Sequence, residues 1–99
     1  MKLSDFTMTV LKNFSQINSG IVIESGNKLR TMNAEKSILA EAELEDSFSC
    51  KFGIYDLVQF LGNVNALGNP DLKFDSKLVE MTDGNLVLKY FSCATDLIS

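Results

Sequence analysis

The two cysteines and the absence of histidine limit the chemistry that this chain can perform. Cys50 and Cys93 are too few for a disulfide scaffold and too far apart in sequence for a zinc-binding pair. A nucleophilic thiol needs a neighbouring base or positive charge, and histidine usually supplies it. Cys50 alternates with Phe48 and Phe52, so we expect it to pack in the core. We therefore predict no catalytic residue, no metal ion and no cofactor.

Carboxylates between residues 41 and 46 form the densest group of possible metal or acid–base residues. Glu41 and Glu43 alternate with apolar residues, which places them on the outer face of a strand. Glu45 and Asp46 follow in a predicted turn, and the group lacks the spacing of a calcium-binding loop. We expect a solvated strand face here instead of a calcium site or an acid–base pair.

Length and charge exclude several classes of protein. The chain has 99 residues and a formal charge of −4, with 45% hydrophobic residues, which is typical of one folded domain. No apolar run approaches the ~20 residues of a membrane span, and the first residues do not resemble a signal peptide. We predict no membrane partner. The net negative charge argues against a compact nucleic-acid reader with a basic surface.

Two helices are predicted from the spacing of apolar residues. Ser4 and Asp5 are good capping residues for the first, which residues 18–20 end. Asp56 favours the start of the second, and Pro70 lies beyond its end. The apolar stripes predicted to face the core are Phe6, Val10, Phe14 and Ile17 in the first helix, and Leu57, Phe60, Leu61, Val64 and Leu67 in the second.

Alternating apolar residues predict strands after each helix, and residues 1–3 are expected to form a short strand before the first. The predicted strands are 21–24, 28–32, 38–44, 48–54, 71–75, 78–82 and 86–91. The order is a βαβββ unit that occurs twice. We predict an α+β fold in which an antiparallel sheet carries two helices on one face. Residues 1–99 form a single domain with internal repeats at approximately 1–46 and 47–93.

Short blocks in constant order through residues 1–91 carry a family resemblance. They are Met1–Ser4, Leu11–Phe14, Ile17–Ile21, Ser25–Gly26, Ala40–Ala42, Ile54–Leu57, Phe60–Gly62 and Asp83–Asn85. These blocks resemble the N-terminal domain of the DNA sliding clamps, or polymerase processivity factors, of large tailed phages. The resemblance implies a clamp domain fold and a second similar domain in the family chain.

The resemblance also implies a function that depends on topology. Sliding clamps are not enzymes; they close a ring around duplex DNA without reading its sequence and tether the DNA polymerase. The helices line the hole and the sheets form the outer wall, so a net acidic chain is compatible with this function. The implied partners are duplex DNA, the polymerase, a clamp loader and further copies of the chain, in the cytoplasm of an infected bacterial host. A ring of three two-domain chains corresponds to about six copies of a one-domain chain.

The polar faces of the helices supply the candidate DNA-facing residues that this resemblance implies. They are Lys2, Lys12, Gln16, Gln59 and Asn63. An ordinary solvated lysine is the alternative for Lys12. The second helix has no basic residue, and this favours a second hypothesis: a small acidic protein-interaction module that keeps the clamp fold, binds a partner by strand addition or in a groove, and does not encircle DNA.

The C-terminal part of the chain carries apolar residues with two possible explanations. Phe91 and Leu97–Ile98 could mark an exposed edge or a contact between subunits. A frayed terminus is the other possibility, and the sequence leaves both open.

Overall fold

The computed structural model describes residues 1–94, which contain two helices and seven strands. In chain order they are α1 (Asp5–Phe14), β1 (Ile21–Ile23), β2 (Gly26–Met32), β3 (Leu39–Phe48), β4 (Phe52–Ile54), α2 (Leu57–Ala66), β5 (Asp71–Phe74), β6 (Leu78–Asp83) and β7 (Leu86–Phe91). This order confirms the predicted α+β class. The predicted boundary between the two repeats, at residues 46 and 47, lies inside β3. The division of a single domain into these repeats stays a prediction.

Both helices start at the residues predicted to cap them. The Ser4 hydroxyl accepts a hydrogen bond from the Thr7 N–H at 3.2 Å, and the Asp56 carboxylate accepts one from the Gln59 N–H at 3.1 Å. Each bond satisfies a backbone donor that has no partner within its helix. After α2, Gly68 adopts a left-handed backbone with φ of +71° and turns the chain.

The buried face of α1 differs from the predicted stripe. The residues that face the core are Thr7, Val10, Leu11 and Phe14, whereas Phe6 is 55% exposed. The expectation for Phe6 was therefore wrong, because the core-facing stripe passes one residue further along the helix. Thr7 can be fully buried because its hydroxyl donates to the Asp46 carboxylate at 2.6 Å.

α1 also ends earlier than the sequence predicts. Its last helical residue is Phe14, and the Ser15 hydroxyl donates to the Lys12 carbonyl at 2.6 Å. Tight turns follow, in which the Ile17 N–H bonds the Phe14 carbonyl at 2.9 Å. Ile17 is half-buried in this turn and lies outside the helix. The predicted stripe of α2, by contrast, is buried along its whole length.

Within residues 1–94 all strand pairs are antiparallel, as predicted, and they divide among three small sheets. β1 pairs with β4, β2 pairs with β3, and β5, β6 and β7 form a three-stranded sheet. The predicted continuous strand 48–54 was wrong. Residues 49–51 separate β3 from β4, because the chain there changes partner from β2 to β1. Cys50 lies in this connection and is half-buried, so it is not the core residue expected.

The two halves of the chain pair across each other. Met1 exchanges backbone hydrogen bonds with Leu72 of β5, at 2.7 Å from its amino group and 2.6 Å to its carbonyl. The expected first strand is thus reduced to this single pairing. In the second half, β4 pairs with β1 of the first half. Each half therefore supplies the segment before its helix to the strand that follows the other helix.

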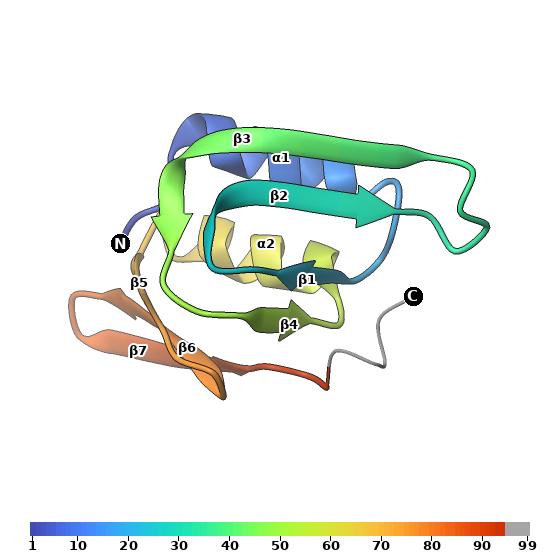
Figure 1. Ribbon diagram of the computed structural model, residues 1–99. Helices are drawn as coiled ribbons and strands as arrows, with labels where there is room; N and C mark the ends of the chain where they lie inside the picture. The colour runs from blue at the N-terminus through green and yellow to red at the C-terminus, as the bar shows by residue number, and fades with distance from the viewer. Residues whose placement is uncertain (95–99) are drawn as a thin grey trace.

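Both helices lie on one side of the paired strands β1–β4 and β2–β3, behind them in Figure 1. A single hydrophobic core joins the helices and strands of both halves. The ring of Phe74 in β5 meets the rings of Phe48 in β3 and Phe52 in β4 edge-on, with centroid distances of 5.5 Å and 5.3 Å. Within residues 1–94, neither helix is long and apolar enough to cross a membrane.

Candidate nucleic-acid interface

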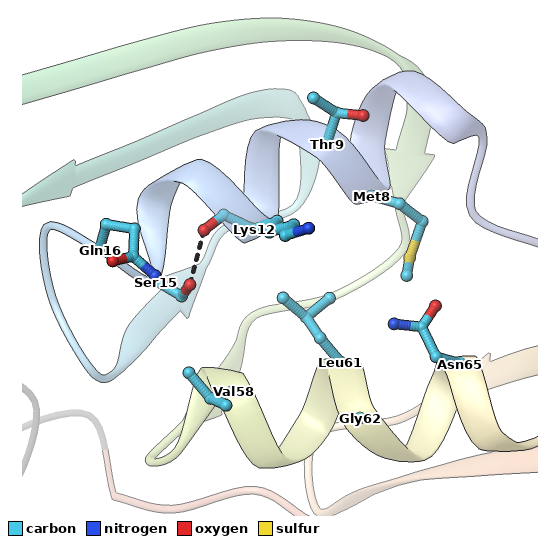
Figure 2. A pocket seen from close by; sticks show the side chains of 9 residues that line it. All are labelled: Met8, Thr9, Lys12, Ser15, Gln16, Val58, Leu61, Gly62 and Asn65. Carbon is cyan, nitrogen blue, oxygen red and sulfur yellow. Dashed lines mark hydrogen bonds between the residues drawn. The ribbon is translucent and has the colours of Figure 1, made fainter.

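An open groove of about 450 Å³ lies between the two helices on the face turned away from the strands. Figure 2 shows this groove with α1 and α2 side by side and the strands behind them. The side that carries the buried stripe of each helix faces the core, so the groove belongs to the opposite, solvent side. Its lining residues are Met8, Thr9, Lys12, Ser15 and Gln16 from α1 and its C-terminal turn, and Val58, Leu61, Gly62 and Asn65 from α2.

The groove has an apolar floor and walls of mixed character, on which polar groups lie beside the 61% exposed side chain of Val58. Met8 and the nearly buried Leu61 form the floor, and Figure 2 shows their side chains pointing into the space between the helices. The walls carry the Lys12 ammonium, the amides of Gln16 and Asn65, and two hydroxyls. Among residues 1–94, no carboxylate lines the groove. One cation with several neutral donors is suited to contact with an anion such as phosphate.

The predicted DNA-facing residues occupy different parts of this surface. Lys12 and Gln16 are exposed and line the groove. Gln59 is exposed on α2, and Asn63 is half-buried, but neither lines it. Lys2 is exposed before α1 and also lies outside the groove. The structure thus brings two of the five together, and the DNA contact of all five stays a prediction.

Sequence reasoning missed most of the α2 wall. Val58, Gly62 and Asn65 follow one another at helical spacing beside the buried stripe, as Met8 and Ser15 do on α1. Their spacing was a signal that they share a flank of each helix. Which flank faces the other helix depends on how the two helices pack, and that follows from contacts between distant parts of the chain.

The acidic residues of β3 lie on the strand side of the molecule. Glu41, Glu43 and Glu45 are exposed, and Glu41 forms an ion pair with Arg30 of β2 at 3.8 Å. Lys28 is the strand partner of Glu43. Within residues 1–94, no group of three histidine, cysteine or acidic residues is placed to hold a metal ion. These three carboxylates are therefore kept away from the groove between the helices.

Asp46 differs from these solvated carboxylates because it is tied to α1. Its Oδ2 accepts hydrogen bonds from the Thr7 hydroxyl at 2.6 Å and from the Ser4 N–H at 2.9 Å. Burial alone would raise the pKa of Asp46, but these hydrogen bonds outweigh it and hold the pKa below its usual value. Asp46 thus fixes the start of the helix that carries Lys12.

Comparison with known proteins gives consistent matches over nearly the whole chain. Residues 2–92 match the model of the DNA polymerase processivity factor family. The chain is 44% identical over 91 residues to a protein of Vibrio phage KVP40 that is named sliding clamp. This alignment covers 91% of the chain and 41% of the relative. It is 37% identical to the sliding clamp of Enterobacteria phage T4 and 35% identical to that of Escherichia phage RB69, each over 87% of this chain and 36% of the relative. The chain thus spans about two fifths of the length of these relatives.

Proposed function

The chain belongs to the DNA polymerase processivity factor family, as its sequence resemblance predicts, and we propose that it is one clamp domain of a ring that encircles duplex DNA and tethers a DNA polymerase. The family match over residues 2–92, together with relatives named sliding clamp, carries this proposal. In this proposal the chain is not an enzyme, because a ring that encloses its ligand needs no catalytic group. Its place of action is the infected bacterial cell.

The helix side of the domain is the surface that we propose faces the DNA. The groove between the helices contributes one ammonium group and several neutral donors, and no carboxylate from residues 1–94. Phosphate contacts of this kind are weak and independent of sequence. A ring that holds DNA by enclosure requires contacts that break easily, so that it can slide. The proposed contacts are Lys2, Lys12, Gln16, Gln59 and Asn63.

Ring closure is proposed to use the unpaired edges of the sheets. Among the described residues, β3 pairs only with β2 and β7 only with β6, so each leaves one free edge. Leu86, Val87 and Phe91 of β7 are more than half exposed, and an exposed apolar edge favours strand addition. Leu97–Ile98, the other apolar residues considered for this contact, lie outside the described residues. A ring built from this chain alone would need about six copies.

A processivity assay on primed circular single-stranded DNA tests the proposal. In the presence of the cognate polymerase and clamp loader, the chain is expected to increase the length of DNA that the polymerase synthesises each time it binds the template. A linear template with free ends serves as the control, because a ring slides off it and the stimulation falls. If a closed oligomer of the chain gives no stimulation on the circle, the proposed function is wrong.

One observation favours the second candidate, an acidic interaction module that does not encircle DNA. α2 presents no basic side chain, and Lys12 is the only basic residue in α1. A lining with so little positive charge attracts DNA weakly. Sedimentation at micromolar concentration separates the two candidates: the mass of one chain supports the module, and a ring-sized mass supports the clamp.

A further inference from the structure

Gly62 is a glycine in the middle of a helix, and the fold itself gives no reason for it. Glycine destabilises a helix interior relative to alanine because it loses more backbone freedom on folding. Gly62 does not adopt the left-handed backbone that would require glycine, and a Cβ atom built on it meets no heavy atom within 4 Å. Neither backbone geometry nor internal packing therefore excludes a side chain at this position.

The position of Gly62 in the groove suggests what the missing side chain leaves room for. Gly62 lies on the α2 wall, across the groove from Lys12 on α1 (Figure 2). A longer side chain here would extend into the space beside the Lys12 ammonium. Within residues 1–94 no side chain fills that space, so it is open to a group from another molecule. The groove carries a cation and neutral donors such as Asn65, which favours an anionic group.

We propose that Gly62 keeps the groove open so that a phosphate group of the DNA backbone can enter it and reach the Lys12 ammonium. Gln16 and Asn65 would serve as neutral hydrogen-bond donors on either side. Gly62 acts here as a positioning residue, because it gives access and makes no bond of its own. This inference rests on the proposed function and names the place on the helix side where a phosphate is held.

Substitution by leucine tests the effect of bulk without adding a charge or a hydrogen-bond donor. Gly62→Leu adds a bulky apolar side chain inside the groove, and Ala66→Leu adds the same side chain to an exposed position of α2 that does not line it. Binding of a short mixed-sequence DNA duplex at low salt is followed by the NMR signals of the backbone amides. The signals of Lys12, Gln16 and Gly62 are expected to shift in the wild type. Affinity is expected to fall about threefold or more in Gly62→Leu and to remain unchanged in Ala66→Leu.

Thermal unfolding measures whether both variants are folded, and Gly62→Met repeats the test if the leucine variant is not. Equal DNA affinity of wild type and a folded Gly62 variant would overturn this inference. If Lys12→Gln still weakens binding in that case, the proposed DNA-facing surface survives and only the role of Gly62 is lost. If the duplex shifts no signal on either helix, or shifts only signals of the strand side, the proposed DNA-facing surface fails as well.

Discussion

The Thr7 hydroxyl and the Asp46 carboxylate are joined by a hydrogen bond of 2.6 Å that connects the buried face of α1 to β3. The residues are 39 positions apart in the chain, and Thr7 has no exposed surface. The same carboxylate oxygen also accepts the Ser4 N–H. One acidic side chain thus fixes both the first turn of the helix and its distance from the sheet.

Removing the Thr7 hydroxyl is expected to destabilise the fold. Thr7→Val keeps the shape of the side chain but leaves Asp46 without its shortest hydrogen bond, which should cost about 1–3 kcal/mol. Urea unfolding measures the difference. Thr9→Val on the exposed face of the same helix is the matched control and should change stability by less than about 0.5 kcal/mol. Equal stability of Thr7→Val and wild type would contradict this reading of the network.

Acid is expected to weaken the same connection. The pKa of Asp46 is lower in the folded protein than in the unfolded chain, so the unfolded chain binds the proton more readily. The stabilisation is complete above the pKa of an unfolded aspartate, about 3.9, and is lost as the pH falls through the lower folded value. Thermal unfolding between about pH 5 and pH 2 should show this loss, and it should be smaller in Asp46→Asn. If the Asp46→Asn variant loses as much stability in acid as the wild type, Asp46 is not the source of the acid sensitivity.

Two glycine substitutions are expected to act in opposite directions. Gly62→Ala should stabilise the protein by about 0.5–1 kcal/mol, because alanine suits a helix interior and its Cβ has open space. Gly68→Ala should destabilise it, since Gly68 has φ of +71° after α2. Chemical unfolding of both variants gives the comparison. A destabilised Gly62→Ala would show that the position has an internal role.

Lys12→Gln should weaken binding to duplex DNA and reduce its salt dependence. Loss of one phosphate contact lowers the slope of log affinity against log salt by about 1. Lys51→Gln is the control, because Lys51 lies in the β3–β4 connection and forms an ion pair with Glu24 at 3.7 Å. Fluorescence anisotropy of a labelled duplex at several salt concentrations measures both variants. An equal reduction of the slope in Lys51→Gln would mean that the helix side is not the DNA-facing surface.

A charge on the free edge of β7 should prevent self-association. Phe91 is 67% exposed at the end of this strand, and Phe91→Glu places a carboxylate where a second strand would pack. Sedimentation velocity should then show only single chains at concentrations where the wild type assembles. Tyr55→Glu changes a similarly exposed aromatic residue that lies outside the strands, and it should assemble normally. An assembled Phe91→Glu would place the subunit contact elsewhere.

Local sequence rules predicted the features of the fold that depend on neighbouring residues. The capping residues Ser4 and Asp56 and the buried stripe of α2 follow from spacing along one helix. The α1 stripe was misplaced because the partner that allows Thr7 to be buried is Asp46, far along the chain. The predicted strand 48–54 failed for a similar reason, since the change of partner from β2 to β1 has no signal in the alternation of apolar residues.

Only part of the candidate site was predicted from the sequence, because its residues come from two elements that pack together. Lys12 and Gln16 could be found because Lys12 lies on the polar face of α1 and Gln16 lies in the turn that follows the same helix. Gly62 and Asn65 line the groove only because α2 packs beside α1 with that flank turned toward α1. Such packing depends on the whole core and not on the pattern within a single helix.

The exchange of segments between the two halves also affects synthesis of the protein. Met1 pairs with Leu72, and β1 pairs with β4, so the first half lacks these strand partners until β4 and β5 have been made. A nascent chain that ends after β3 has an exposed β1 edge and an unpaired N-terminal segment. We therefore expect folding to start late in translation and to be limited by contacts between distant residues.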